Sequence, residues 1–233
     1  MAQKKLQRFA DIKNFANVLE YPEHMQGQWN NFFKNDNQII LELACGRGEY
    51  TVGLSKLFAQ QNFIGVDVKG NRMYIGAKKA LEENIINAAF LRTQIEKLAT
   101  YFATSEVDEI WITFPDPQLR ISKEKKRLTH PRFLRLYQQI LKPSGVIHLK
   151  TDSPELYFFT KKVIELYGLN IVEDYSDIYR QPAIKEELKI KTHYESLDIA
   201  QSKKIHYLKF MLPVVIKNID DQLQEILKNE QPG

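Results

Sequence analysis

Cysteine is scarce in this sequence of 233 residues, because only Cys45 is present. A single cysteine excludes an internal disulfide and is typical of a reducing compartment, so we expect a cytoplasmic protein. The chain also lacks any run of about 18 apolar residues, so we expect no transmembrane helix and no membrane partner. Its first residues, MAQKKLQRFADIK, lack the apolar segment of a secretory signal. The five histidines have no spacing typical of metal ligands, so we expect no metal.

Charge of one sign is concentrated in two places on a chain whose net charge is only +4. Between Arg120 and Arg135 there are seven basic residues and one acidic residue, Glu124. A second, smaller group of basic residues lies near the N-terminus and consists of Lys4, Lys5, Arg8 and Lys13. Such clusters are typical either of a solvated face or of a surface that binds a polyanion.

Apolar strands alternate with amphipathic helices along most of the chain. We predict strands over residues 38–44, 62–68, 87–93, 107–114, 146–152, 169–176 and 204–212. Helices are predicted over residues 14–34, 49–60, 71–86, 131–141 and 154–168, and a turn over 142–145. Strands that are apolar throughout indicate a parallel sheet covered on both faces. We therefore predict an α/β fold with a largely parallel seven-stranded sheet and helices on both faces.

Three parts of the chain differ in character. Residues 1–34 read as a basic, mobile arm followed by a helix, and residues 35–212 contain the whole predicted sheet. Residues 213–233 form a C-terminal tail with some helical periodicity and no recognisable function. We expect 35–212 to be the main domain.

A glycine pair follows the first predicted sheet strand in the stretch LELACGRGEYTVGL, residues 41–54. A dinucleotide site needs a third glycine, but Thr51 occupies that position, and no Walker loop is present. S-adenosyl-L-methionine has no pyrophosphate, so the tight turn at Gly46 and Gly48 suffices for its amino-acid end. Asp67, at the end of the next strand, is placed to accept hydrogen bonds from ribose hydroxyls.

The third and first of these strands add further candidates. Gln94 is placed to hydrogen-bond the adenine, with Ile95 packing on its ring. Glu42 lies within an apolar strand, where a carboxylate is costly unless it is paired or functional. The alternatives are purely structural: Gly46 and Gly48 would form an ordinary turn, and Asp67 would cap a helix. The combination favours a methyltransferase.

The stretch ITFPDPQLRISKEKKRLTHPRF, residues 112–133, indicates the substrate. Two prolines bracket Asp116 just past the fourth strand, where a methyl acceptor meets the cofactor. The basic run follows at once, so we predict a polyanionic acceptor whose phosphates are held by Arg120, Lys125, Lys126 and Arg127.

These motifs together resemble the bacterial tRNA (guanine-N7)-methyltransferases. The shared features are LE-x-x-x-G-x-G at Leu41 to Gly48, FPDP with RLTHPRFL, KTD at 150–152 and T-x-Y-E at 192–195, in order over about 38–212. The resemblance implies a Rossmann-like class I methyltransferase that modifies a variable-loop guanine of tRNA to 7-methylguanosine. It implies that the cofactor site is lined by Glu42, Asp67, Gln94 and Asp116. It implies substrate contacts by Arg120, Asp152, Thr192, Tyr194 and Glu195, and a chain that acts alone, as a monomer or homodimer.

The chain departs from the family pattern in two places. QLRISK follows FPDP where the family usually has Trp-Pro-Lys-Lys-Arg-His, and Gln94 stands where Asp or Asn is more usual. Guanine N7 carries a lone pair and no proton, so we expect Asp116 to orient the guanine or offset its positive charge, and not to act as a general base. The alternatives are a methyltransferase for another RNA, a protein or a small molecule, or an RNA-binding module without catalysis.

Overall fold

The computed structural model of the protein describes residues 2–197, 201 and 203–229. Its sheet has eight strands in the order β1-β4-β3-β2-β5-β6-β8-β7. The strands are β1 Val18–Glu20, β2 Gln38–Leu43, β3 Gln61–Asp67, β4 Ala88–Arg92, β5 Val107–Thr113, β6 Leu141–Thr151, β7 Asn170–Tyr175 and β8 His206–Met211. Five neighbouring pairs are parallel, and only the pairs made by β8 with β6 and β7 are antiparallel. The largely parallel α/β sheet is confirmed, with one strand more than predicted.

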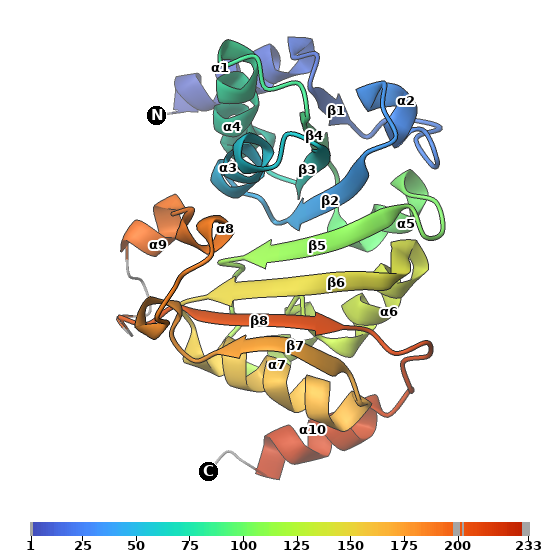
Figure 1. The fold of residues 1–233 in the computed structure, drawn as a ribbon, viewed down its shortest axis with the longest axis vertical. Coiled ribbons are helices and arrows are strands. Elements are labelled where there is room, and N and C mark those ends of the chain that lie inside the picture. The colour runs from blue at the N-terminus through green and yellow to red at the C-terminus, as the bar shows by residue number, and fades with distance from the viewer. Residues whose placement is uncertain (1, 198–200, 202, 230–233) are drawn as a thin grey trace.

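Helices cover both faces of this sheet (Figure 1). The α-helices are α1 Ala2–Asp11, α2 Trp29–Phe33, α3 Glu49–Leu57, α4 Gly70–Glu82, α5 Leu98–Tyr101, α6 Pro131–Ile140, α7 Pro154–Tyr167, α8 Glu186–Lys189, α9 His193–Leu197 and α10 Asp220–Asn229. Short 3₁₀ helices are η1 Ile12–Asn14, η2 Ile95–Lys97, η3 Ile121–Lys126 and η4 Ile178–Arg180.

Alternate side chains of β2 show why its sequence is apolar throughout. Ile39, Leu41 and Leu43 belong to the core that includes residues of α5, α6, α7 and α10. Ile40 belongs to a second core with Tyr50 of α3. Because both faces of the strand are buried, the period-2 alternation of a half-exposed strand is absent.

The predicted helix over residues 14–34 is wrong. Val18–Glu20 instead forms the edge strand β1, which pairs with β4 from Val18 opposite Phe90. Pro22 disfavours helical backbone in the residue before it, and within this described range only Trp29–Phe33 is α-helical. Within the predicted N-terminal arm, Ala2–Asp11 forms α1 and packs against α4.

The turn predicted at residues 142–145 lies within β6 as an irregularity of its pairing. Leu141 pairs with Val107, and the regular register resumes at Val146 opposite Glu109. A Cβ on Gly145 would lie 2.5 Å from Cγ of Leu141, so this irregularity requires glycine.

The C-terminal residues 213–229 pack against the rest of the molecule. Ile216 and Leu223 are buried in the main core. Asp220 accepts two hydrogen bonds from Arg135 of α6 and one from Tyr167 of α7. The division at residues 34/35 and 212/213 remains a prediction. In the part of the chain that the structure describes, no helix has the length and apolar character to cross a membrane.

Candidate active site

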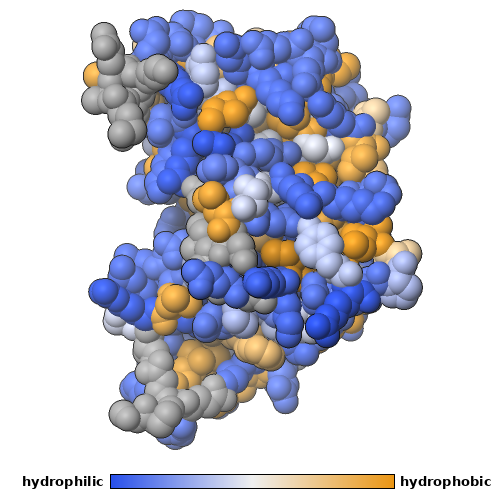
Figure 2. Space-filling model, turned by 90° about the vertical axis from the view of Figure 1, so that its left-hand side faces the viewer, coloured by the Kyte–Doolittle hydropathy of each residue, from blue (hydrophilic) through white to orange (hydrophobic). Residues whose placement is uncertain are grey.

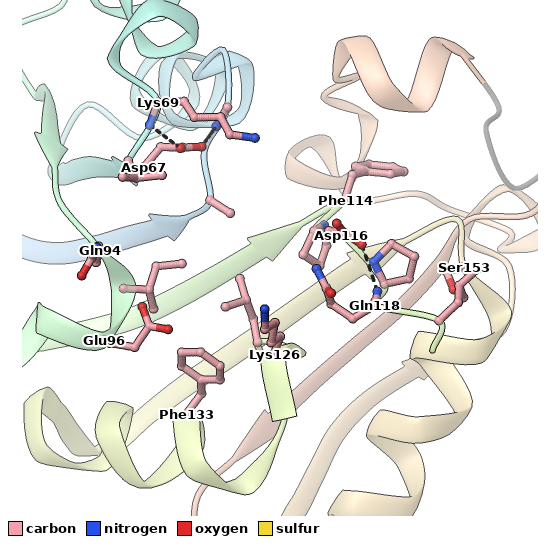
Figure 3. Close-up of a pocket in the computed structure, with 18 of the residues that line it drawn as sticks. Asp67, Lys69, Gln94, Glu96, Phe114, Asp116, Gln118, Lys126, Phe133 and Ser153 are labelled. Atoms are coloured by element: carbon pink, nitrogen blue, oxygen red, sulfur yellow. Dashed lines mark hydrogen bonds between the residues drawn. The ribbon is translucent and has the colours of Figure 1, made fainter. Parts of the chain in front are cut away.

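A pocket of about 1030 Å³ lies at the carboxyl ends of the parallel strands, where α/β sheets bind their ligands (Figure 3). Residues that follow β2, β3, β4, β5 and β6 all contribute to its wall. The predicted site residues among them are Gly46, Asp67, Gln94, Ile95, Asp116, Lys126 and Asp152. The face at which these strands end is largely hydrophilic (Figure 2), which suits a polar or ionic ligand.

Asp67 fixes the turn after β2. Its Oδ2 accepts a hydrogen bond from the backbone N–H of Gly46 (2.9 Å), and its Oδ1 accepts one from Lys69 N–H (2.8 Å). A carboxylate has about four lone-pair directions, so each oxygen can still accept a further hydrogen bond. Gly46 has φ 57° and Ala44 has φ 56°, which turns this backbone sharply at the pocket wall. The structure thus brings together the first glycine and the acidic residue as predicted.

Glu42 lies outside the residues that line the pocket. Its carboxylate is buried and accepts hydrogen bonds from Thr51 N–H (2.8 Å), Thr51 Oγ1 (2.5 Å) and Thr113 Oγ1 (2.7 Å). Burial raises the pKa of Glu42 to about 7, while the hydrogen bonds from Thr51 and Thr113 lower it. Glu42 therefore joins β2 to α3 and β5 beneath the turn. Thr51, which excluded a dinucleotide motif, is its principal partner.

Gly48 also lies outside the pocket wall. It has φ 72° and precedes the first residue of α3. A Cβ at this position would lie 2.5 Å from Cε1 of Phe90, on β4. The second glycine is thus required by close packing of α3 against the sheet and by its backbone conformation.

The segment after β4 lines the pocket with Thr93, Gln94 and Ile95. Thr93 is fully buried, and its Oγ1 has no hydrogen-bond partner among the described residues. An unpaired buried hydroxyl is uncommon and marks a place where a ligand or water can bind. Our sequence interpretation assigned no binding role to Thr93, although it adjoins Gln94.

The FPDP segment forms an irregular turn after β5. Phe114 has φ 47° and Gln118 has φ 48°, so the residues on either side of the Pro-Asp-Pro sequence adopt a left-handed conformation. Oδ1 of Asp116 accepts a hydrogen bond from Gln118 N–H (3.0 Å), and Asp116 is exposed at the pocket. Non-glycine residues in this conformation concentrate at functional sites.

The basic residues between Arg120 and Arg127, here called the basic loop, include exposed side chains and one buried side chain. Lys126 lines the pocket, and Arg120 and Lys125 are exposed outside it. Arg127 is buried, with an exposed fraction of 7%, and its guanidinium donates to backbone carbonyls. Arg132, which the sequence interpretation did not single out, lines the pocket. Its Nη2 lies 3.4 Å from Oε1 of Glu96.

The KTD and T-x-Y-E motifs contact each other at the carboxyl end of β6. Asp152 lines the pocket, whereas Lys150 is fully buried and pairs with Glu195. Oγ1 of Thr192 accepts a hydrogen bond from Glu195 N–H (3.1 Å) at the start of α9. Thr192 and Glu195 do not line the pocket, and the side chain of Tyr194 lies outside the described part of the structure.

Two histidines have structural roles. His148 is buried between Tyr207 and Glu109, and His130 Nδ1 accepts a hydrogen bond from Arg132 N–H at the start of α6. Among the residues that the structure describes, no three His, Cys, Asp or Glu side chains gather as a metal site.

A family model described as "Putative methyltransferase" matches residues 36–208. A tRNA (guanine-N(7)-)-methyltransferase of Bacteroides fragilis is 46% identical over 91% of this chain and 87% of its own. The enzyme of the same name from Porphyromonas gingivalis is 49% identical over 86% of each chain. A 30S ribosomal A1408 methyltransferase from an uncultured bacterium has a TM-score of 0.60 at 21% identity, over 82% of this chain and 96% of the other. The predicted class I methyltransferase fold is confirmed.

Proposed function

The chain belongs to the tRNA (guanine-N(7)-)-methyltransferase family, and on that premise we propose that it methylates guanine N7 in tRNA with S-adenosyl-L-methionine. The observation that carries the proposal is one pocket with Asp67 on one side and Asp116 on the other (Figure 3). Asp67 is suited to a nucleoside, and Asp116 is followed by a basic loop suited to nucleic acid. The cytoplasm remains the proposed location, and a monomer or homodimer the proposed assembly.

The pocket residues fit S-adenosyl-L-methionine. Asp67 retains acceptor capacity for ribose hydroxyls, and the buried Thr93 hydroxyl has no partner among the described residues. Gln94 and Ile95 lie beside Thr93 and supply an amide and an apolar side chain for the adenine. We propose Gly46 for the amino-acid end, where the backbone is free of a side chain. Glu42 and Gly48 support this site from beneath.

When bound, the cofactor would supply an activated methyl group on its sulfonium, and the lone pair of guanine N7 would accept that methyl group. The transfer would leave positive charge on the guanine. Asp116 is exposed at the pocket and is suited to offset that charge or to hold the guanine edge. The rest of the catalysis is orientation of the two reactants, because no proton has to be removed first.

We propose that tRNA phosphates contact the exposed basic residues Arg120, Lys125 and Lys126. Lys126 lies in the pocket wall, next to the chemistry. Asp152 faces the same pocket and is proposed to contact the guanine. Direct contacts by Thr192, Tyr194 and Glu195 remain predictions from the family resemblance. A variable-loop guanine suits the site because it costs less to extrude than a paired base.

The test is methyl transfer to an unmodified tRNA transcript from labelled S-adenosyl-L-methionine, followed by borohydride and aniline treatment. Cleavage in the variable loop supports the donor, the acceptor and the N7 position together. Transfer of label without cleavage would support methyltransferase activity but would show that the methylated atom is not guanine N7. If the protein binds S-adenosyl-L-methionine and transfers no label, the acceptor is not this tRNA.

A further inference from the structure

We propose that Arg127 is a positioning residue that holds the FPDP turn, and with it Asp116, at the pocket, and that it does not bind tRNA phosphate. The proposal rests on the proposed function, because Asp116 has a role only in that reaction. It separates one member of the basic loop from its neighbours, although sequence alone groups Arg127 with Lys125 and Lys126.

The contacts of Arg127 point toward the turn. Its Nε donates a hydrogen bond to the carbonyl of Pro117 (3.1 Å), and its Nη2 donates one to the carbonyl of Gln118 (3.3 Å). The guanidinium carbon lies 4.4 Å from the ring centroid of Phe159 on α7. With 7% of its surface exposed, the side chain is poorly placed to meet a phosphate from solvent.

Within the described part of the chain, few other hydrogen bonds fix the turn between β5 and η3. At its start, Phe114 N–H donates to the carbonyl of Lys150 (2.8 Å). Pro115 and Pro117 carry no N–H group and cannot donate hydrogen bonds. The hydrogen bond between Asp116 and Gln118 is internal to the turn, so it does not fix the turn to the fold. Among the residues that the structure describes, Arg127 therefore joins the far end of the turn to α7 through its hydrogen bonds and its packing on Phe159.

The backbone at this end needs such support. Gln118 has φ 48°, a left-handed conformation that non-glycine residues adopt only when their surroundings hold them there. The carbonyl of the same residue accepts the hydrogen bond from Arg127. Releasing it lets Gln118 relax, and Asp116, two residues earlier, then loses its orientation at the pocket.

The geometry requires arginine. Nε and Nη2 lie on one edge of a planar group, so they can donate to two adjacent carbonyls while the flat face packs on a ring. A lysine ammonium carries the same charge but cannot provide the paired donors and the flat face together. Burial lowers the pKa of Arg127, and the carboxylates of Glu124 and Glu155 act in the opposite direction.

The decisive variants are Arg127→Lys and Arg127→Met, with Lys125→Met as the exposed control. For tRNA methylation we would measure kcat and KM between 50 and 200 mM salt (on the order of the range over which phosphate contacts are resolved). We expect both Arg127 variants to lower kcat at least about tenfold, with tRNA KM and its salt dependence unchanged. Lys125→Met should leave kcat unchanged, raise KM and flatten its salt dependence.

A second readout does not depend on activity. Amide hydrogen exchange at Gln118 should become at least about tenfold faster in both Arg127 variants, while the amides of β5 keep their protection. A phosphate contact predicts the opposite pattern: Arg127→Lys near the wild type in kcat, KM and exchange, and Arg127→Met altered only in KM and its salt dependence. That pattern would overturn the proposal. If Arg127→Met does not fold, Arg127→Lys alone separates the two interpretations. A wild-type protein that does not methylate tRNA overturns the proposed function instead, and the exchange at Gln118 still reports on Arg127.

Discussion

Lys150 Nζ lies 2.9 Å from Oε2 of Glu195, and the two side chains are 0% and 5% exposed. The same ammonium group donates to the carbonyls of Leu188 and Ile190, each at 2.9 Å. One buried lysine at the end of β6 thus holds the segment of α8 and α9, which lies beside the carboxyl ends of the strands in Figure 1. The KTD and T-x-Y-E motifs are therefore one structural unit, with Lys150 and Glu195 as its internal contact.

Removing one partner of this pair should lower the free energy of unfolding more than removing both partners. Lys150→Met leaves the Glu195 carboxylate and two carbonyls buried without their donor, so we expect a loss of about 3–5 kcal/mol in the free energy of unfolding. The double variant Lys150→Met, Glu195→Gln should recover part of it. Urea unfolding of the wild type, both single variants and the double variant gives the four free energies of a double-mutant cycle. Additive effects would mean that the ion pair contributes no coupling energy.

Glu42 gives a pH dependence whose sign follows from its burial. Its pKa rises from 4.5 to about 7 on folding, so the unfolded state ionises first as the pH increases. The contribution of Glu42 to the stability of the wild type should therefore fall between about pH 4.5 and 7, by about 3 kcal/mol, and stay level above that range. Glu42→Gln keeps an acceptor for Thr51 and removes the titration.

We would test the predicted pH dependence by chemical unfolding of the wild type and Glu42→Gln. The measurements would be made at pH 5, 6, 7 and 8 (steps of about one unit around the raised pKa). The stability of the variant relative to the wild type should increase with pH and level off near pH 8. All other titrating groups are common to both proteins and cancel in the difference. A difference that does not change with pH would contradict the raised pKa of Glu42.

Gly48 and Gly168 provide a matched pair for the packing of α3. Both have positive φ, 72° and 66°, but a Cβ at Gly48 would meet Phe90 at 2.5 Å, whereas nothing lies within 4 Å of one at Gly168. Gly168→Ala should cost about 1–2 kcal/mol for its backbone conformation alone. Gly48→Ala should cost about 1–3 kcal/mol more because of overpacking. Thermal and urea unfolding measure both, and equal losses would show that Phe90 moves aside freely.

The sheet and part of the pocket wall could be predicted because their signals are local. Apolar strands buried on both faces, such as β2, are visible as continuous runs, and the residues that end them must meet at one edge of the sheet. Gly46, Asp67, Gln94 and Asp116 were found in this way. β1 was missed because three residues, Val18–Glu20, owe their conformation to pairing with β4, which lies about 70 positions later.

The residues that support the site could not be predicted from their neighbours in sequence. Arg127 stands in a basic run, and only the fold shows that it faces Pro117 and Gln118 while Lys125 faces solvent. The structural role of Lys150 likewise cannot be predicted from its sequence neighbours, because its partner Glu195 lies 45 positions later in the chain. Charge composition indicates the partner of a surface, but burial decides which charges belong to that surface.

Asp67→Asn should weaken S-adenosyl-L-methionine binding at least tenfold (about 1.4 kcal/mol or more). An asparagine has one acceptor oxygen, so it cannot accept from both Gly46 N–H and Lys69 N–H and still present a carboxylate to the ribose hydroxyls. Asp108→Asn is the matched control, because Asp108 also accepts a backbone N–H, that of Ile39 (2.9 Å), but at the opposite end of β2. Calorimetry should give a dissociation constant for Asp108→Asn within about twofold of the wild type, because its loss falls on stability and not on the pocket. Equal weakening by both variants would mean that the effect of Asp67 is transmitted through the fold and that another group holds the ribose.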